Sequence, residues 1–122
     1  ELNYKIQVDE NVEDDKIQIP HSLIYTFAEN AIKHGLRPKQ DNRILSINVF
    51  KVDHQTKISI TDNGVGRAKS KELNTTDTGK GMEIVKIIIS GYNQLHGGQI
   101  NYSVEDVLEG TEVMGTLVEI WV

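Results

Sequence analysis

Residues 56–66 read TKISITDNGVG, a short alternation of polar and apolar residues that ends in an acid and two glycines. The alternation is typical of a β-strand with one buried face. One interpretation of Asp62 is an ordinary turn residue, because Asp-Asn-Gly is a strong turn sequence by itself. The other is that its carboxylate stands at the end of a strand, beside a corner where Gly64 and Gly66 carry no side chains. The glycines alone do not decide between the two.

The second interpretation predicts a particular ligand. A carboxylate only accepts hydrogen bonds, so it matches the exocyclic amine of adenine and opposes the carbonyl oxygen that guanine carries there. Asp62 would then face an adenine base, and Gly64 and Gly66 would let the backbone turn without a side chain intruding on it.

The composition is that of one globular domain, and it excludes several classes of site. The chain has 122 residues and a net charge of −5, which argues against an extended nucleic-acid-binding surface. The absence of cysteine excludes disulfides, thiolate zinc sites and a thiol nucleophile. No apolar run approaches the length of a membrane span. The chain begins at Glu1 without a methionine, so we expect residues 1–122 to be one domain of a longer protein.

The periodicities predict a mixture of strands and helices. Apolar residues recur at helical spacing over 21–34 and 81–96, and Gly35 is the expected C-terminal cap of the first helix. Acidic turns are expected at 9–15 and 105–112, and a loop at 67–80. Alternation predicts strands at 3–8, 16–19, 43–52, 56–61, 99–104 and 115–122. We therefore predict an α+β fold, a two-layer sandwich in which helices cover one face of a mixed sheet.

Asn30 is an unusual residue for the middle of the first helix. Asn is a mediocre helix former, and here it has no capping role. A solvated polar face shared with Thr26, Lys33 and the neighbouring Glu29 is one interpretation. The alternative is a Mg²⁺ ligand, since an amide oxygen suits this ion and Mg²⁺ keeps most of its waters and phosphate oxygens. Lys33 and His34, one turn later, would then approach phosphate groups.

A third segment, Gly79-Lys80-Gly81, comes immediately before the second helix. Free backbone N–H groups and the helix dipole attract anions there, although a flexible loop would have the same composition. The spacing matches neither a Walker A motif nor a dinucleotide fingerprint.

The order of four segments resembles the N, G1 and G2 boxes and the last strands of the GHKL ATPases. These segments are ENAIKHG (29–35), DNGVG (62–66), GKGM (79–82) and GTLVEI (115–120). Within that superfamily, IPHSLIYTFAENAIKHGL is most similar to the LytS/YehU type of bacterial sensor histidine kinase. The resemblance spans nearly the whole chain and implies the GHKL sandwich fold, with ATP and Mg²⁺ as cofactors.

The resemblance also assigns roles to residues. It implies that Asn30 coordinates Mg²⁺ and that Lys33 and His34 approach the phosphates. Asp62 would read adenine in a pocket shaped by Gly64 and Gly66, with Thr116 on the strand behind the base. The second glycine box, Gly79, Lys80, Gly81 and Met82, would close over the phosphates.

One departure from the family pattern affects the expected activity. Thr26 stands where gyrase-like members place a water-activating glutamate, which argues against efficient ATP hydrolysis. Glu29 is the nearby carboxylate and our candidate for metal binding or proton handling.

A histidine that accepts the phosphoryl group is not expected within this chain. Its histidines lie at a helix start, at the phosphate edge, in a turn and at a helix end, at positions 21, 34, 54 and 96. The resemblance therefore implies a kinase domain that phosphorylates a histidine of an upstream dimerisation domain, with a response regulator downstream. It further implies the cytoplasmic part of a membrane-anchored homodimer. A nucleotide-sensing module without kinase activity and an anti-sigma-factor serine kinase remain alternatives.

Overall fold

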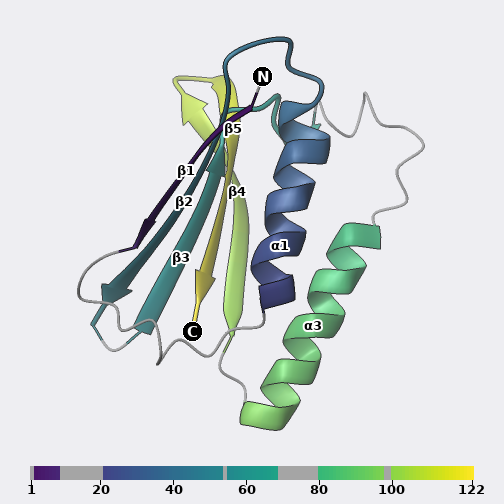
Figure 1. Ribbon diagram of the computed structural model, residues 1–122, viewed down its shortest axis with the longest axis vertical. Coiled ribbons are helices and arrows are strands. Elements are labelled where there is room, and N and C mark those ends of the chain that lie inside the picture. Colours follow the sequence, from purple (N-terminus) through teal and green to yellow (C-terminus); the bar gives the residue numbers. More distant parts are fainter. Residues whose placement is uncertain (1, 9–20, 54, 69–79, 98–99) are drawn as a thin grey trace.

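The computed structural model describes residues 2–8, 21–53, 55–68, 80–97 and 100–122. Within these residues, five strands and the helices α1, η2 and α3 follow one another (Figure 1). The strands are β1 (Leu2–Val8), β2 (Arg43–Val52), β3 (Gln55–Asp62), β4 (Asn101–Glu109) and β5 (Glu112–Trp121). The helices are α1 (His21–Asn30), which continues as the π-helical η2 (Ala31–Leu36), and α3 (Lys80–His96).

The strands form one mixed sheet in the order β1-β2-β3-β5-β4. Only the β1–β2 pair is parallel, with Tyr4 beside Leu45, and the other pairs are antiparallel. In the centre of the sheet, Asp62 on β3 lies opposite Thr116 on β5 and Leu45 on β2. The last residue of β3 is therefore flanked by a strand on each side.

Helices α1 and α3 pack against one face of this sheet. The core contains Leu23 and Phe27 of α1, Val85 and Ile89 of α3, and inward-facing residues of the strands such as Ile60. On β3 the buried residues are Ile58, Ile60 and Asp62, so alternation of period two sets the face that meets the helices. Asn93 joins the end of α3 to the start of β4, where its side chain exchanges hydrogen bonds with the backbone of Ile100 (2.8 and 3.2 Å).

The predicted α+β sandwich is confirmed, with two local corrections. The predicted acidic connection over 105–112 is wrong, because β4 runs to Glu109 and the reversal is confined to the turn at Gly110, which has φ +64°. The predicted cap at Gly35 is also wrong, since the helix passes through Gly35 as a π-turn and ends after Leu36. The predicted turn at 9–15, the predicted strand at 16–19 and most of the loop at 67–80 lie outside the described residues.

Candidate nucleotide-binding site

Asp62 is buried at the end of β3, with 4% of its surface exposed. Its Oδ1 accepts a hydrogen bond of 2.8 Å from the backbone N–H of Gly64. Burial raises the pKa of this carboxyl to about 6, while hydrogen bonds from the Gly64 and Thr116 backbones act in the opposite direction. The site therefore contains a desolvated acceptor group held by backbone donors.

The corner after Asp62 is fastened to the loop that precedes β2. The Asn63 side chain accepts from the backbone N–H of Ile44 (2.8 Å) and donates to the carbonyl of Asn42 (2.7 Å). Lys39 donates from Nζ to the carbonyl of Asn63 at 3.0 Å. These bonds explain why the DNGVG segment forms a fixed corner, and they assign Asn63 a structural role.

Gly35 lies against this corner from the side of the helix. Its carbonyl accepts a hydrogen bond of 3.0 Å from the backbone N–H of Val65. A Cβ at Gly64 would lie 2.2 Å from the Gly35 carbonyl oxygen, so the two backbones meet at a distance that only glycine permits. The wide π-turn follows from this contact, because Gly35 and Leu36 are buried at the point where the helix meets β3. The tertiary contact, and not a capping preference, determines the end of the helix.

Asn30 contacts the start of α3. Its Nδ2 lies 4.0 Å from the Met82 Sδ, a long contact to sulfur. This contact joins the predicted motifs ENAIKHG (29–35) and GKGM (79–82). Thr26, one turn earlier, donates its hydroxyl to the backbone carbonyl of Ser22 at 2.7 Å. The Thr26 side chain therefore serves its own helix, as threonine commonly does in helices.

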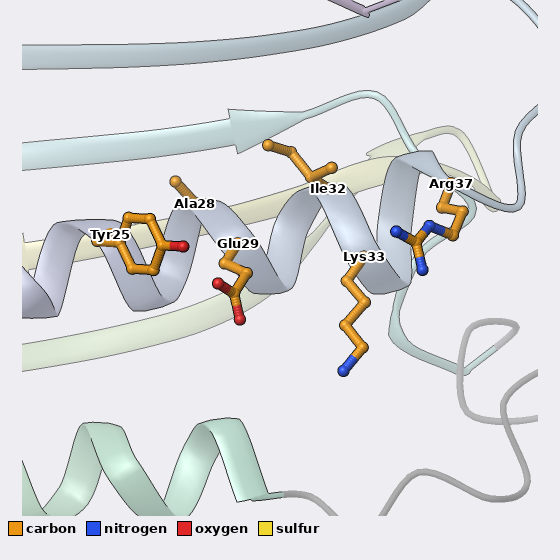
Figure 2. Close-up of a pocket in the computed structure, with 6 residues that line it drawn as sticks. All are labelled: Tyr25, Ala28, Glu29, Ile32, Lys33 and Arg37. Atoms are coloured by element: carbon orange, nitrogen blue, oxygen red, sulfur yellow. The ribbon is translucent and has the colours of Figure 1, made fainter.

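A hollow of about 450 Å³ lies along α1 and η2. Figure 2 shows Glu29 and Lys33 projecting from one side of the helix, while Ala28 and Ile32 project from the other. Tyr25 and Arg37 complete the lining. A hydrogen bond to Glu29 and the charge of this carboxylate raise the pKa of the exposed Tyr25.

The structure brings some predicted site residues together and separates others. Asp62, Gly64 and Thr116 form one group, and Gly66 follows with φ +86°. Asn30 and Met82 form a second group. Glu29 and Lys33 line the hollow, of which Asn30 is not a part, and His34 is half-buried. Lys80 and Gly81 are in the first turn of α3, and Gly79 lies outside the described residues.

Sequence reasoning missed two residues of this region. Gly35 was assigned to a helix cap, although it contacts Asp62, and no local pattern reveals that contact. Arg37 lies one turn beyond Lys33, and the basic spacing of these residues could have indicated a shared surface.

The described residues contain no group of three or more acidic, histidine or cysteine side chains that could hold a metal ion by themselves. This finding is compatible with the predicted Mg²⁺ site, since that ion takes few protein ligands when phosphate oxygens and water supply the rest. Asn30 fits such a role, because its Nδ2 is turned toward Met82 and its Oδ1 is the opposite end of the amide. Within the same described residues, no helix is both long and apolar enough to cross a membrane.

The sequence is similar to part of a curated protein. It is 36% identical over 66 residues to the sensor protein LytS of Oceanobacillus iheyensis. The match covers 54% of this chain and 11% of LytS, so the chain corresponds to a small part of that relative. No protein-family model matches the chain.

Solved structures of histidine kinases share the fold over nearly all of the chain. The mycobacterial sensor histidine kinase MprB aligns over 99% of this chain and 80% of its own, with a TM-score of 0.65 and 16% identity. A nucleotide-free form of the catalytic domain of histidine kinase ThkA aligns over 99% of this chain and 79% of its own, with a TM-score of 0.65 and 17% identity. The blue-light activated histidine kinase of Erythrobacter litoralis EL346 gives a TM-score of 0.62 at 16% identity, and this chain covers 35% of it.

The TM-scores show that the fold is shared with these kinases, and the LytS match adds a sequence similarity over about half of the chain. Together they confirm the predicted resemblance to the GHKL domains of sensor histidine kinases: the chain has the fold of their catalytic domains, and about half of its sequence is similar to LytS.

Proposed function

We propose that this domain binds Mg-ATP and donates the γ-phosphoryl group to a histidine of an upstream dimerisation domain in a two-component signalling system. One observation carries the proposal: a buried carboxylate, Asp62, ends a central strand among backbone donors and glycines of three motifs. Burying an acid without a function is costly, and a ligand amine that hydrogen-bonds the carboxylate would offset that cost.

Adenine is the base that best fits Asp62. The carboxylate accepts hydrogen bonds and cannot donate them when ionised, so an exocyclic amine is favoured over a carbonyl oxygen. Gly64 and Gly66 let the corner pack closely beside Asp62, since a Cβ at Gly64 would meet the Gly35 backbone and one at Gly66 would meet the Val113 side chain. Thr116 supports the carboxylate from the neighbouring strand β5.

The phosphates and the metal belong, in this proposal, to the region between α1 and α3. Asn30 would supply one Mg²⁺ ligand, and Met82 holds its amide in place. The start of α3 at Lys80 and Gly81 is suited to anions because its first N–H groups have no partner within the helix. Gly79, Lys33 and His34 complete the proposed phosphate contacts.

The role of Glu29 is less central than that of Asn30. Its carboxylate is exposed beside Tyr25 in the hollow along α1 and η2. We propose proton handling or metal binding for Glu29 as the catalytic group of this helix.

The proposed partners follow from the resemblance to sensor kinases. They are ATP, the dimerisation and phosphoacceptor domain of the same protein, and a downstream response regulator. We propose that the whole protein is a membrane-anchored homodimer with this domain on the cytoplasmic side.

The test is phosphorylation of the full-length protein with γ-labelled ATP and Mg²⁺. We expect an acid-labile label on a histidine outside residues 1–122, lost in the Asn30→Asp and Asp62→Ala variants. Asp62→Ala should also weaken ATP binding by about tenfold or more, since a lost buried hydrogen-bond partner costs about 1–3 kcal/mol. Acid-stable label on a partner's serine would favour the anti-sigma-factor kinase, and ATP binding without any label would favour the nucleotide-sensing module.

A further inference from the structure

Three glycines from separate parts of the chain surround Asp62. Gly35 belongs to η2, Gly64 to the corner after β3, and Gly115 to β5. A Cβ at Gly115 would lie 1.9 Å from the Asp62 backbone oxygen, and one at Gly64 would lie 2.3 Å from the Gly35 carbonyl carbon. Both of these approaches are to backbone atoms, so these two glycines hold the chain itself.

Gly35 differs from the other two glycines because it meets the side chain of Asp62 and not its backbone. A Cβ there would lie 2.8 Å from Asp62 Oδ1 and 3.3 Å from Oδ2. Gly35 has no positive φ angle that would disfavour alanine. The missing methyl group therefore matters for the position of the carboxylate and not for the backbone conformation.

We propose that Gly35 is a positioning residue that determines base specificity: its bare Cα sets where the Asp62 carboxylate stands, and thereby selects a 6-aminopurine over a 6-oxopurine. The inference rests on the proposed function of Asp62. Its physical basis is that two groups fix the position of Asp62 Oδ1. The Gly64 N–H donates a hydrogen bond of 2.8 Å to this oxygen, and the Cα of Gly35 limits how far the oxygen can move. An added methyl group would turn the carboxylate away from the Gly64 donor and from the amine of the base.

The experiment compares ATP with inosine triphosphate, which has a carbonyl oxygen in place of the amine. Calorimetry gives the two dissociation constants for the wild type, for Gly35→Ala and for Gly91→Ala. Gly91 is the matched control, because nothing lies within 4 Å of a Cβ at that position. We expect the wild type and Gly91→Ala to prefer ATP by about tenfold or more, and Gly35→Ala to lose most of that preference.

If Gly35 had a merely structural role, Gly35→Ala would weaken the binding of both nucleotides equally. An unchanged preference of Gly35→Ala for ATP would therefore overturn the inference. A wild type that binds the two nucleotides equally would instead contradict the proposed role of Asp62. The two failures are therefore distinguishable.

A double-mutant cycle tests the inference if Gly35→Ala folds poorly. Thermal unfolding is measured for Gly35→Ala, Asp62→Ala and the double variant. Since the proposed clash involves the carboxylate, the destabilisation caused by Gly35→Ala should disappear on the Asp62→Ala background. An equal loss of melting temperature in both backgrounds would show that Gly35 acts through other atoms.

Discussion

The ionised carboxylate of Asp62 destabilises the folded protein, because it is buried. Its pKa rises from 3.8 to about 6 on folding, mainly because of burial. Folding thus favours the protonated form, and this favourable contribution is complete below about pH 4 and is lost as the pH rises through about 6. A shift of about two units corresponds to about 3 kcal/mol.

Asp62→Asn should therefore stabilise the nucleotide-free domain above about pH 7, where the wild type pays for a buried charge. The gain in melting temperature should shrink toward about pH 4.5, because the wild-type carboxyl is then protonated. Thermal unfolding at the two pH values measures it. A gain of the same size at both would contradict the buried-charge explanation.

The same group predicts how nucleotide binding depends on pH. If the ionised carboxylate accepts a hydrogen bond from the amine of the base, protonation of Asp62 should weaken this bond. The affinity for ADP should therefore fall as the pH decreases below about 6. The phosphates of ADP titrate in the same pH range. Asp62→Asn therefore serves as the control, because this variant retains the contribution of the phosphates but lacks the carboxylate. Calorimetry should give a steeper pH dependence for the wild type, and parallel curves would argue against Asp62 as the base-reading group.

At the scale of elements, alanine should have opposite effects at two glycines, Gly91 inside α3 and Gly97 just after it. Gly91 is in the helix interior, exposed and without neighbours around a Cβ, so Gly91→Ala should stabilise the domain by about 0.5–1 kcal/mol. Gly97 has φ +84° just after the helix, so Gly97→Ala should destabilise it by about 1 kcal/mol. Chemical denaturation of both variants checks this pair, and two changes of the same sign would contradict it.

Elements were predictable from sequence where their cause is local. The alternation predicts the bounds of β2 and β3 to within a residue, because one face of each strand packs against the core. The end of the first helix was not predictable, since Gly35 continues into a π-turn to meet Asp62 and Gly64. The same limit applies to the site: the motifs named Asn30 and Met82 separately, but only the packing of α1 on α3 shows their contact.

On the scale of the whole molecule, the fold divides the proposed chemistry between two places. Asp62, the proposed base-reading group, ends the central strand β3. Asn30, the proposed Mg²⁺ ligand, contacts Met82 of α3, and Figure 1 shows α1 and α3 on the same face of the sheet. Both places depend on the first helix, in which Gly35 of η2 meets the end of β3 and Asn30 of α1 meets α3. A nucleotide that bridges them would therefore stabilise the packing of the helices on the sheet.

The domain alone should bind ATP and yet hydrolyse it slowly. Phosphoryl transfer requires a nucleophile in line with the γ-phosphate, and an attacking water needs a base or a positioning group. The resemblance to gyrase-like members implies that the position of Thr26 would supply this base, but here the Thr26 hydroxyl donates to the Ser22 carbonyl, and Glu29 lines the hollow along α1 and η2. We therefore expect turnover far below the 1–10³ s⁻¹ typical of enzymes.

A coupled ADP-release assay on residues 1–122 measures this rate. The upstream dimerisation domain, added in trans, should increase ATP consumption only until its histidine is phosphorylated, because a histidine acceptor is used once in each transfer. The Asp62→Ala variant controls for contaminating ATPases, since it should abolish the nucleotide-dependent signal. Brisk, sustained hydrolysis by the isolated wild-type domain would show that another group activates water, and would favour a hydrolytic GHKL activity over histidine phosphorylation.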